Sequence, residues 1–484
     1  MATRFQTVDR VTPYLLPQSI EDWLPEDHLA RFVVEVVSKL DLAPLRASCA
    51  GRGSTPYDPG MLLSLLFYGY ATGVRSSRKI EAGTHDSVAF RYIAANSHPD
   101  HDTIASFRLR FLVEIGEYFV RILEVARETG MRQVGSVSLD GTKVKANASK
   151  HRAMSYRHAR KIREQLRDEV DELLRMAEEA DRNENRTVID VPAELKRREK
   201  RLDLIESAVK EIERRAAETY RMEKEEYDGK MAVREKKEKT TGKKAKGKKP
   251  AEPKPGPGDK DQVNFTDEES RIMPVSGGGF EQAYNAQAVV DNASRLIVGT
   301  DLGHAPVDRQ ALQPVLEAMK RNPEGLTTPE TVLADAGYCS KQNVEYCVKR
   351  GIEPLISIGR EQHNIPLVER CGGSVETSGT TEETESRPDS QFTVRNEEEA
   401  NPIAMSCGPT VDTSMDRMKA RLKTAGGRTE YGKRKGVVEP VFGIIKEVLN
   451  FRRFLLRGLK KAKGEWTLAC MAYNVKRMHI IRTS

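Results

Sequence analysis

The sequence predicts a mixed α/β protein with an all-α N-terminal domain and a helical hairpin inserted into the sheet-forming region. Three observations lead to this prediction. Residues 1–130 carry helical periodicity, residues 151–227 carry it again within a highly charged stretch, and strand-like runs alternate with helices in residues 263–484. A chain of 484 residues is long enough for about three domains.

The composition narrows the class of protein. Lysine and arginine number 79 against 72 aspartate and glutamate, and the resulting net charge of +7 is common among soluble enzymes. The six cysteines are scattered without any C-x-x-C pair, which argues against a structural zinc site and a disulfide framework. No signal peptide is recognisable, and the most apolar run, residues 61–70, is about half of the ~20 residues that a membrane span needs. We therefore expect a cytoplasmic protein with no membrane partner.

The N-terminal domain, residues 1–130, is expected to consist of several short helices. The stretch EDHLARFVVEVVSKL places its apolar residues on one stripe. The stretch HPDHDTIASFRLRFLVEIGEYFVRILEVARETG begins with an aspartate or threonine cap and is expected to form one long amphipathic helix. The first turns of that second helix carry Arg108 and Arg110. Arginines at this place suit a DNA-reading domain, and they suit an ordinary helical domain equally well.

A strand is predicted to end at Asp140 in the stretch VGSVSLDGTKVKANASK, residues 134–150. Alternation with a period of two places the apolar residues on one face of this strand and Asp140 on the other. Lysines follow at once, including Lys143. An aspartate at the end of a strand is common at the start of a turn. It also suits a metal ligand, with the lysines positioned to bind a polyanion.

Residues 151–227 are predicted to form an antiparallel helical hairpin with a coiled-coil seam. Two runs with apolar residues at spacings of three and four flank the break DRNENRTVIDVP. The following residues 228–262 are rich in lysine, proline and glycine and almost free of apolar side chains, so we expect a disordered linker. Solvation alone explains its lysines, although they would also add affinity for phosphates.

Residues 131–150 and 263–484 together are expected to form the sheet. Two β-rich runs joined by a short turn predict a hairpin, and helix and strand then alternate twice, with Asp335 at the end of the strand TVLADAGYCS. Asp308 is interpreted as the N-cap of the helix that follows it. Residues 370–410 are polar and acidic and are predicted to be a loop insertion.

Three carboxylates stand at positions that suit metal-dependent phosphoryl chemistry. Asp140 and Asp335 end two strands, and Glu439 lies on a helical stripe with Gly443 and Lys446. Mg²⁺ prefers hard oxygen ligands, and two such ions about 3.5–4 Å apart activate an attacking oxygen and stabilise a leaving one. The neighbouring lysines and arginines would hold the DNA strands.

Five stretches resemble the bacterial insertion-sequence transposases of the DDE class, which have an RNase H-like catalytic domain. They are PDHDTIASFR, SLDGTKVKANAS, NFTDEESRIMPVSGGGFEQAYNAQAVVD, TVLADAGY and YGKRKGVVEPVFGIIK. The resemblance implies an RNase H-like mixed sheet, and it implies that Asp140, Asp335 and Glu439 are the catalytic, metal-binding triad.

The resemblance extends to the Tyr/Arg/Glu/Lys signature of these transposases, which Tyr431, Arg434, Glu439 and Lys446 match. Four residues separate Arg434 from Glu439 where the family has three, and with the family's spacing the basic residue would be Lys435. The expected DNA contacts are Tyr431, Arg434, Lys446, Lys143, Arg108 and Arg110.

The implied function is that of a transposase. It would bind terminal inverted repeats through residues 1–130, hydrolyse a phosphodiester bond with two Mg²⁺ or Mn²⁺ ions, and transfer the freed 3′-OH to target DNA. A homo-oligomer, at least a dimer on the element's ends, is expected, as is a location at the bacterial nucleoid. Two alternatives are an RNase H-like nuclease without strand transfer and a non-catalytic DNA-binding scaffold. The three intact carboxylates argue against the scaffold.

Overall fold

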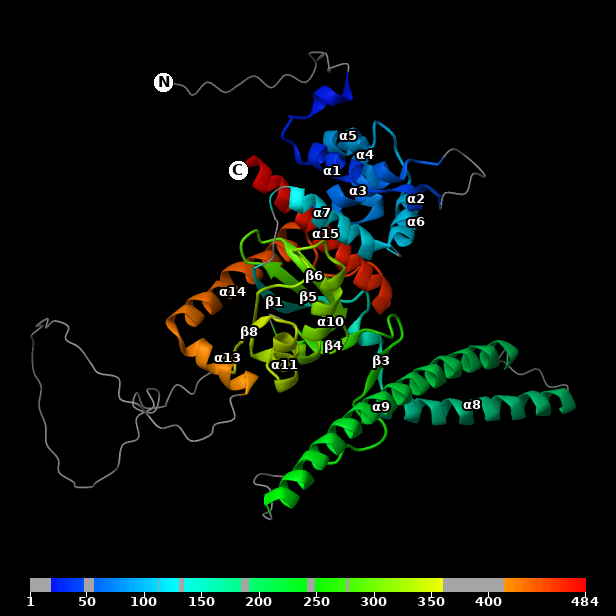
Figure 1. The fold of residues 1–484 in the computed structure, drawn as a ribbon. Helices are drawn as coiled ribbons and strands as arrows, with labels where there is room; N and C mark the ends of the chain where they lie inside the picture. Colours follow the sequence, from blue (N-terminus) through cyan, green and yellow to red (C-terminus); the bar gives the residue numbers. More distant parts are fainter. Residues whose placement is uncertain are drawn as a thin grey trace, which may run out of the picture.

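A sheet lies at the centre of the molecule, with a group of helices on one side and a long helical hairpin projecting from the other, as the computed structural model shows (Figure 1). The structure describes residues 19–47, 56–112, 114–128, 130, 135–183, 191–241, 249–275, 278–359 and 413–484. The predicted acidic loop insertion, residues 370–410, lies outside these ranges.

The central sheet is mixed. Among the described residues it contains β1 (Ser136–Lys145), β4 (Arg271–Pro274), β5 (Phe280–Asp291), β6 (Ile297–Gly303), β7 (Thr331–Ala334) and β8 (Glu353–Ile356). The strand order is β6–β5–β1–β7–β8, and β4 pairs with the first part of β5. β5 is antiparallel to β1 and β6, whereas β1, β7 and β8 run parallel. The arrangement agrees with the predicted RNase H-like mixed sheet, including the β5–β6 hairpin.

The first strand does not end at Asp140 as predicted but continues to Lys145. Its two neighbours explain the difference. The parallel partner β7 ends at Ala334, opposite Leu139, whereas the antiparallel partner β5 continues to pair with β1 as far as Lys145. Asp140 is therefore the position at which β1 loses its parallel neighbour.

The N-terminal residues are helical as predicted, but the long helix expected over residues 98–130 is divided into α6 (His101–Phe111) and α7 (Ile115–Glu128), so that Arg108 and Arg110 lie in the last turn of α6. Aspartate side chains begin two of them: Asp58 accepts hydrogen bonds from the first turn of α3, and Asp100 accepts one from Thr103 in α6. The apolar α3 is buried on nearly all sides. The elements are η1 (Ile20–Trp23), α1 (Leu29–Ser38), α2 (Ala43–Ala47), α3 (Pro59–Ala71), α4 (Ser77–Asp86), α5 (Val88–Ile93), α6 (His101–Phe111) and α7 (Ile115–Glu128).

Further helices cover the sheet. The elements are η3 (Asp308–Gln310), α10 (Leu312–Ala318), η4 (Met319–Arg321), η5 (Ala336–Tyr338), α11 (Lys341–Lys349), α13 (Ser414–Lys423), α14 (Ala425–Gly443), the π-helical segment η6 (Ile444–Val448) and α15 (Leu459–Thr483).

No helix in the described ranges combines the length and the apolar character that a membrane span requires.

Helix α15, which the sequence pattern did not predict, joins the helical domain to the sheet. It packs against α3 and α7 on one side and against β6 on the other (Figure 1). Trp466 donates a hydrogen bond from Nε1 to the carbonyl oxygen of Gln287 at 2.9 Å, and Asn474 hydrogen-bonds both backbone groups of Ile297. One hydrophobic core therefore extends from the N-terminal helices through α15 into the sheet.

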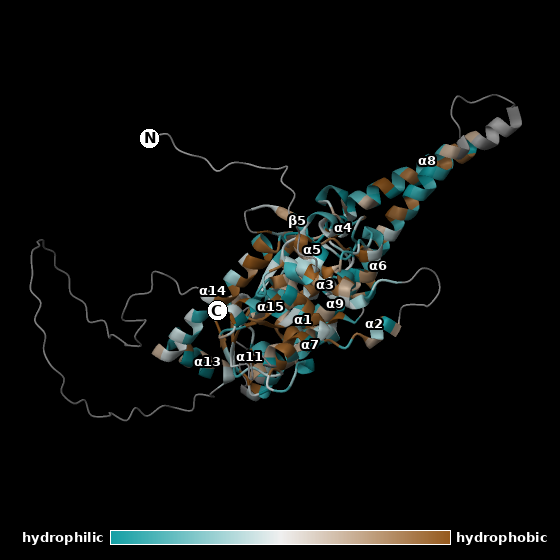
Figure 2. Ribbon diagram, turned by 90° about the horizontal axis from the view of Figure 1, so that it is seen from above, coloured by the Kyte–Doolittle hydropathy of each residue, from teal (hydrophilic) through white to brown (hydrophobic). Residues whose placement is uncertain are grey.

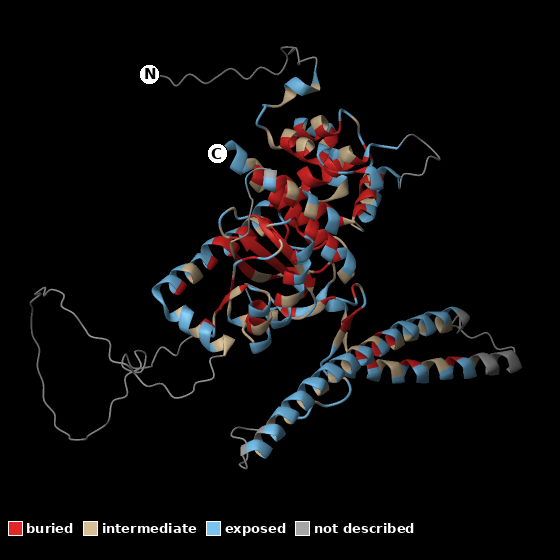
Figure 3. Ribbon diagram, in the orientation of Figure 1, coloured by how far each residue is buried: buried red, intermediate tan, exposed pale blue. Residues whose placement is uncertain are grey.

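The predicted helical hairpin is present. It consists of α8 (Tyr156–Asn183) and α9 (Val191–Thr241), with η2 (Lys150–Arg152) and the strand pair β2 (Ala153–Ser155) and β3 (Gln262–Asn264) at its base. Hydrophilic and hydrophobic residues alternate along the helices (Figure 2), and most of their surface is exposed (Figure 3). The buried seam contains Ala159, Leu166, Ile205 and Val209.

The prediction of a disordered linker over residues 228–262 is wrong for its first part, because α9 continues to Thr241. Acidic and basic side chains four positions apart support this extension: Lys230 pairs with Glu226 at 2.6 Å, and Arg234 pairs with Glu238 at 3.5 Å. Because lysines are so frequent in this stretch, the four-residue spacing of these ion pairs is hard to recognise in the sequence. Residues 242–248 lie outside the described ranges.

Candidate active site at the β1–β7 edge

Asp140 in β1 and Asp335 directly after β7 stand at equivalent positions relative to a parallel pair of strands. Leu139 pairs with Ala334, and the two aspartates are the residues that follow this pair. Asp335 begins the 3₁₀ turn η5 and accepts a hydrogen bond from the backbone N–H of Gly337 at 2.9 Å. The register of β1 and β7 places the backbones of the two aspartates at the same edge of the sheet.

Asp140 is held between a backbone amide and a cation. Its Oδ1 accepts a hydrogen bond from Gly141 N at 2.8 Å, and its Oδ2 accepts one from Arg434 Nη1 at 3.0 Å. Burial raises the pKa of Asp140, and the neighbouring Asp335 adds to the rise, although Gly141 and Arg434 oppose it. A partly buried carboxylate with a perturbed pKa is a candidate functional group.

Arg434 reaches this site from α14, which packs across β1, β5 and β7. Burial disfavours its charge, but Asp140, Tyr431 and Asp335 outweigh that effect, so the pKa of Arg434 is raised. Its Nε is buried and has no hydrogen-bond partner among the described residues. Arg434, and not the exposed Lys435, is thus the basic residue of the signature that contacts a predicted catalytic carboxylate.

Glu439 does not complete the triad in this arrangement. It is exposed, and the described residues contain no group of three or more aspartate, glutamate, histidine or cysteine side chains that could hold a metal ion. The helical spacing gives the reason. Five positions along an α-helix correspond to a rotation of roughly 140°, so Glu439 projects from another side of α14 when Arg434 faces Asp140.

Comparison with protein families gives two matches. The family described as Transposase DDE domain matches residues 255–475, and the family described as Transposase domain (DUF772) matches residues 18–110. The chain is a DDE transposase of the insertion-sequence type. Comparison with curated proteins and with solved structures gave no significant match.

The matched part of the transposase contains Asp335, Arg434 and Glu439 but not Asp140. The hairpin insertion separates β1 from the matched residues in sequence. Because β1 pairs with both β5 and β7, Asp140 lies in the same sheet as the strands of the matched residues.

Lys446 also lies near the paired aspartates. It belongs to the π-helical segment η6, a type of helical distortion that often occurs at functional sites. Burial lowers the pKa of Lys446, and the negative charges of Glu447 and Asp140 partly oppose this effect. A half-buried lysine within the electrostatic reach of Asp140 agrees with the predicted place of Lys446 in the signature.

Two side chains of the transposase that were predicted to contact DNA have partners inside the protein. Lys143 places Nζ 3.1 Å from Asp308 Oδ1, and only 17% of its side chain is exposed. Arg108 is 7% exposed and donates from Nη1 to the carbonyl oxygen of Arg75 at 3.1 Å. Arg110, two positions further along α6, is exposed.

Asp308 was missed as a site residue. The N-cap position of η3 is Val307, so Asp308 does not cap this helix. Its carboxylate instead accepts hydrogen bonds from side chains of β1 and β5. The sequence places it after a strand, in a context where capping is the simplest interpretation. Only the pairing of β1 with β5 shows its actual neighbours.

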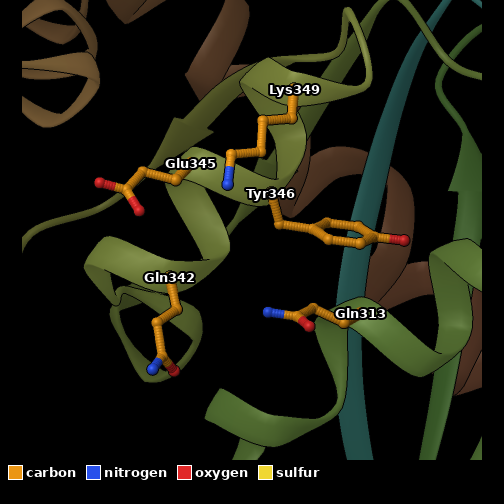
Figure 4. Close-up of a pocket in the computed structure, with 5 residues that line it drawn as sticks. All are labelled: Gln313, Gln342, Glu345, Tyr346 and Lys349. Atoms are coloured by element: carbon orange, nitrogen blue, oxygen red, sulfur yellow. The ribbon is translucent and has the colours of Figure 1, made fainter. Parts of the chain in front are cut away.

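A shallow pocket lies elsewhere on the transposase, between α10 and α11. Gln313, Gln342, Glu345, Tyr346 and Lys349 line it (Figure 4). None of the predicted site residues takes part, so this pocket does not mark the candidate active site.

Proposed function

We propose that the transposase cleaves phosphodiester bonds at the ends of its element and joins the freed 3′-OH to target DNA, with Asp140 and Asp335 as the central catalytic carboxylates. One observation carries the proposal. Leu139 of β1 pairs with Ala334, the last residue of β7, and Asp140 and Asp335 directly follow these two residues. The negative charge of Asp335 adds to the burial that raises the pKa of Asp140, and perturbed carboxylates of this kind are concentrated at functional sites.

The carboxylates of Asp140 and Asp335 fit the hard oxygen ligands that Mg²⁺ or Mn²⁺ prefers. Two bound ions would activate the attacking oxygen and stabilise the leaving one. Glu439 does not fit as a ligand in the described arrangement, because it is exposed on another side of α14. We propose that it joins the site when α14 or its side chain moves on DNA binding.

The residues of α14 support an approach of DNA to the edge of the sheet that carries Asp140. Arg428 and Lys435 are exposed on the helix. Gly436 and Gly443 flank Glu439, and the space beside each of them is open, so no side chain blocks a phosphate backbone there. DNA bound over α14 would bring its phosphates to the edge that carries Asp140.

Two cations would stabilise negative charge at the candidate site. Arg434 offsets the charge of Asp140 and holds that side chain in place. Lys446 would stabilise a phosphate, since a half-buried cation is screened less than an exposed one. We further propose a homo-oligomer, at least a dimer on two element ends, acting at the nucleoid of a bacterial cytoplasm.

The test is a cleavage and joining assay on duplexes that carry the element's ends, with Mg²⁺, with Mn²⁺ and with EDTA. Asp140→Asn, Asp335→Asn and Glu439→Gln should each abolish cleavage and leave DNA affinity unchanged or slightly higher, because removing a negative charge does not weaken attraction to phosphates. Glu345→Gln, an acid of α11, is the matched control and should react normally.

The products separate the alternatives. Cleavage and joining together support a transposase, and cleavage without joining indicates a nuclease. Binding without either reaction indicates a scaffold. Normal cleavage by Asp335→Asn would overturn the assignment of the central carboxylates.

A further inference from the structure

A third aspartate, Asp308, lies close to the candidate catalytic carboxylates and is hydrogen-bonded to residues of β1 and β5. Its Oδ1 accepts three hydrogen bonds: from Lys143 Nζ at 3.1 Å, from Asn285 Nδ2 at 2.7 Å and from Gln287 Nε2 at 3.0 Å. Asn285 and Gln287 are almost fully buried on β5. Because three donors from β1 and β5 bind one oxygen of Asp308, they hold η3 against the sheet.

Gly141 allows this close approach. It follows Asp140 directly and pairs with Gln287 across β1 and β5. A Cβ atom at Gly141 would lie 2.3 Å from Gln287 Nε2 and 2.8 Å from Asp308 Oδ1, both far too close. The carboxylate of Asp308 therefore packs against the bare backbone next to Asp140.

The same group of residues reaches the turn that carries Asp335. Gln287 accepts a hydrogen bond on Oε1 from the hydroxyl of Tyr338, the last residue of η5. Tyr338 is fully buried, and its pKa is raised well above the ordinary value by burial and by Asp308, Asp140 and Asp335. Its hydroxyl therefore stays protonated and remains a hydrogen-bond donor to Gln287.

The second oxygen of Asp308 also faces this turn. Oδ2 lies 3.6 Å from the position that a Cβ atom of Gly337 would take, and Gly337 N donates to Asp335. Asp308 thus lies close to Gly141, which follows Asp140, and to Gly337, which holds the carboxylate of Asp335.

We propose that Asp308 is a positioning residue for the reaction. With Lys143, Asn285, Gln287 and Tyr338 it forms the Asp308 network, which fixes β1 at Gly141 and η5 at Tyr338. The network thereby sets the separation of the Asp140 and Asp335 carboxylates. This inference rests on the proposed catalytic role of those two aspartates. Partners that orient the ligands of a catalytic site typically contribute about 10- to 100-fold to activity or metal affinity.

The test compares Asp308→Asn with a control carboxylate that also pairs with a lysine of β1. Glu281 of β5 places Oε1 3.2 Å from Lys145 Nζ, and its side chain is 29% exposed against 24% for Asp308. The variants are Asp308→Asn, Tyr338→Phe and the control Glu281→Gln. The measurements are kcat and KM for cleavage of an end duplex, and Mn²⁺ binding to the DNA-free protein by electron paramagnetic resonance.

The expected result is a fall of about 10- to 100-fold in kcat or in Mn²⁺ affinity for Asp308→Asn, with KM for DNA unchanged. Hydrogen exchange at the amide of Gly337 should become faster, because η5 loses its support. Tyr338→Phe should reproduce part of these effects, and it keeps the test valid if Asp308→Asn fails to fold. Glu281→Gln should leave every value unchanged.

Three outcomes would overturn the proposal: kcat and Mn²⁺ binding of Asp308→Asn and Tyr338→Phe within twofold of the unaltered protein, an equal loss in Glu281→Gln, or a change in KM alone. Failure of the catalytic assignment looks different, because Asp140→Asn and Asp335→Asn would then themselves cleave normally.

Discussion

Arg434 Nη1 lies 3.0 Å from Asp140 Oδ2, although 294 positions separate the two residues. The contact joins helix α14 to the strand at the centre of the sheet. Only 9% of the Arg434 side chain and 21% of the Asp140 side chain are exposed, so solvent screens the pair weakly. Removal of one partner leaves the other charge in an environment that disfavours it.

Arg434→Gln should therefore destabilise the protein. We expect a loss of about 1–3 kcal/mol in the free energy of unfolding, below the full penalty for a buried pair because Asp140 keeps some solvent. Urea unfolding measures this loss. In Asp140→Asn the same Arg434→Gln change should cost less, because the ion pair is already absent. Lys433→Gln, which removes an exposed pair with Glu430 on the same helix, should change stability by less than about 1 kcal/mol. Equal effects of the two substitutions would contradict the prediction.

Arg108→Ala should reduce stability and not the salt dependence of DNA binding. The side chain is buried beside Arg75, so its loss leaves a cavity and removes a hydrogen bond to a backbone carbonyl. We expect a loss of about 1–3 kcal/mol in the free energy of unfolding. A salt titration of binding should keep its slope, whereas loss of one phosphate contact lowers the log–log slope by about 0.9. The same titration on Arg110→Ala serves as the comparison from the exposed side of α6. A shallower slope for Arg108→Ala would place that residue at the DNA.

Glu465 should make stability depend on pH. It is fully buried in α15, where it accepts backbone hydrogen bonds from Leu455 and Leu456 and lies 3.5 Å from Arg75. Burial raises the pKa of Glu465 above its ordinary 4.5, despite the opposing effects of these amides and of nearby arginines. Folding therefore favours the protonated form. The corresponding stability is fully present below pH 4.5 and is lost as the pH rises through the folded-state pKa.

Glu465→Gln does not titrate and keeps its stability over that range. The unaltered protein should therefore lose stability relative to Glu465→Gln as the pH rises from about 4.5 through the raised pKa. Urea unfolding of both proteins across this range gives the difference directly. A difference that stays constant, or that changes in the opposite direction, would show that the carboxylate is stabilised in its charged form.

Gly141→Ala should destabilise the sheet at the active site. The new Cβ would meet Gln287, whose side chain is buried and hydrogen-bonded and has little room to shift. Overpacking of this kind costs about 1–3 kcal/mol. Thermal or urea unfolding should show the loss, and Gly135→Ala is the control, since a Cβ there meets nothing closer than 3.9 Å. Unchanged stability in Gly141→Ala would mean that Gln287 rearranges freely.

Local patterns predicted the elements but, apart from the β5–β6 hairpin, did not show which strands pair. Alternation and capping residues located β1, β7 and α11. The prediction that β1 ends at Asp140 was wrong because the length of a strand depends on its neighbours, and β5 extends further than β7. Helix α15 gave no amphipathic stripe because it is buried on nearly all sides, and such a helix lacks a polar face.

The side-chain roles depended still more on tertiary contacts. Arg108 and Lys143 have the residue type and position of DNA ligands, yet one packs beside Arg75 and the other pairs with Asp308. Charge and sequence position cannot distinguish a phosphate ligand from a partner of a distant carboxylate. The position of Glu439 on its helix was predictable, but its orientation followed from which side of α14 faces Asp140.

The place of α15 between the helical domain and the sheet has a consequence for biosynthesis. The ribosome makes α3 and α7 long before it makes the helix that covers them. At about 5–20 residues per second, the apolar surface of these helices stays uncovered for roughly 20 to 80 seconds until Trp466 and its neighbours are synthesised. The nascent chain should therefore bind chaperones while its first helices are exposed. A transcript cut short before α15 should give an aggregating product and not a partly active one.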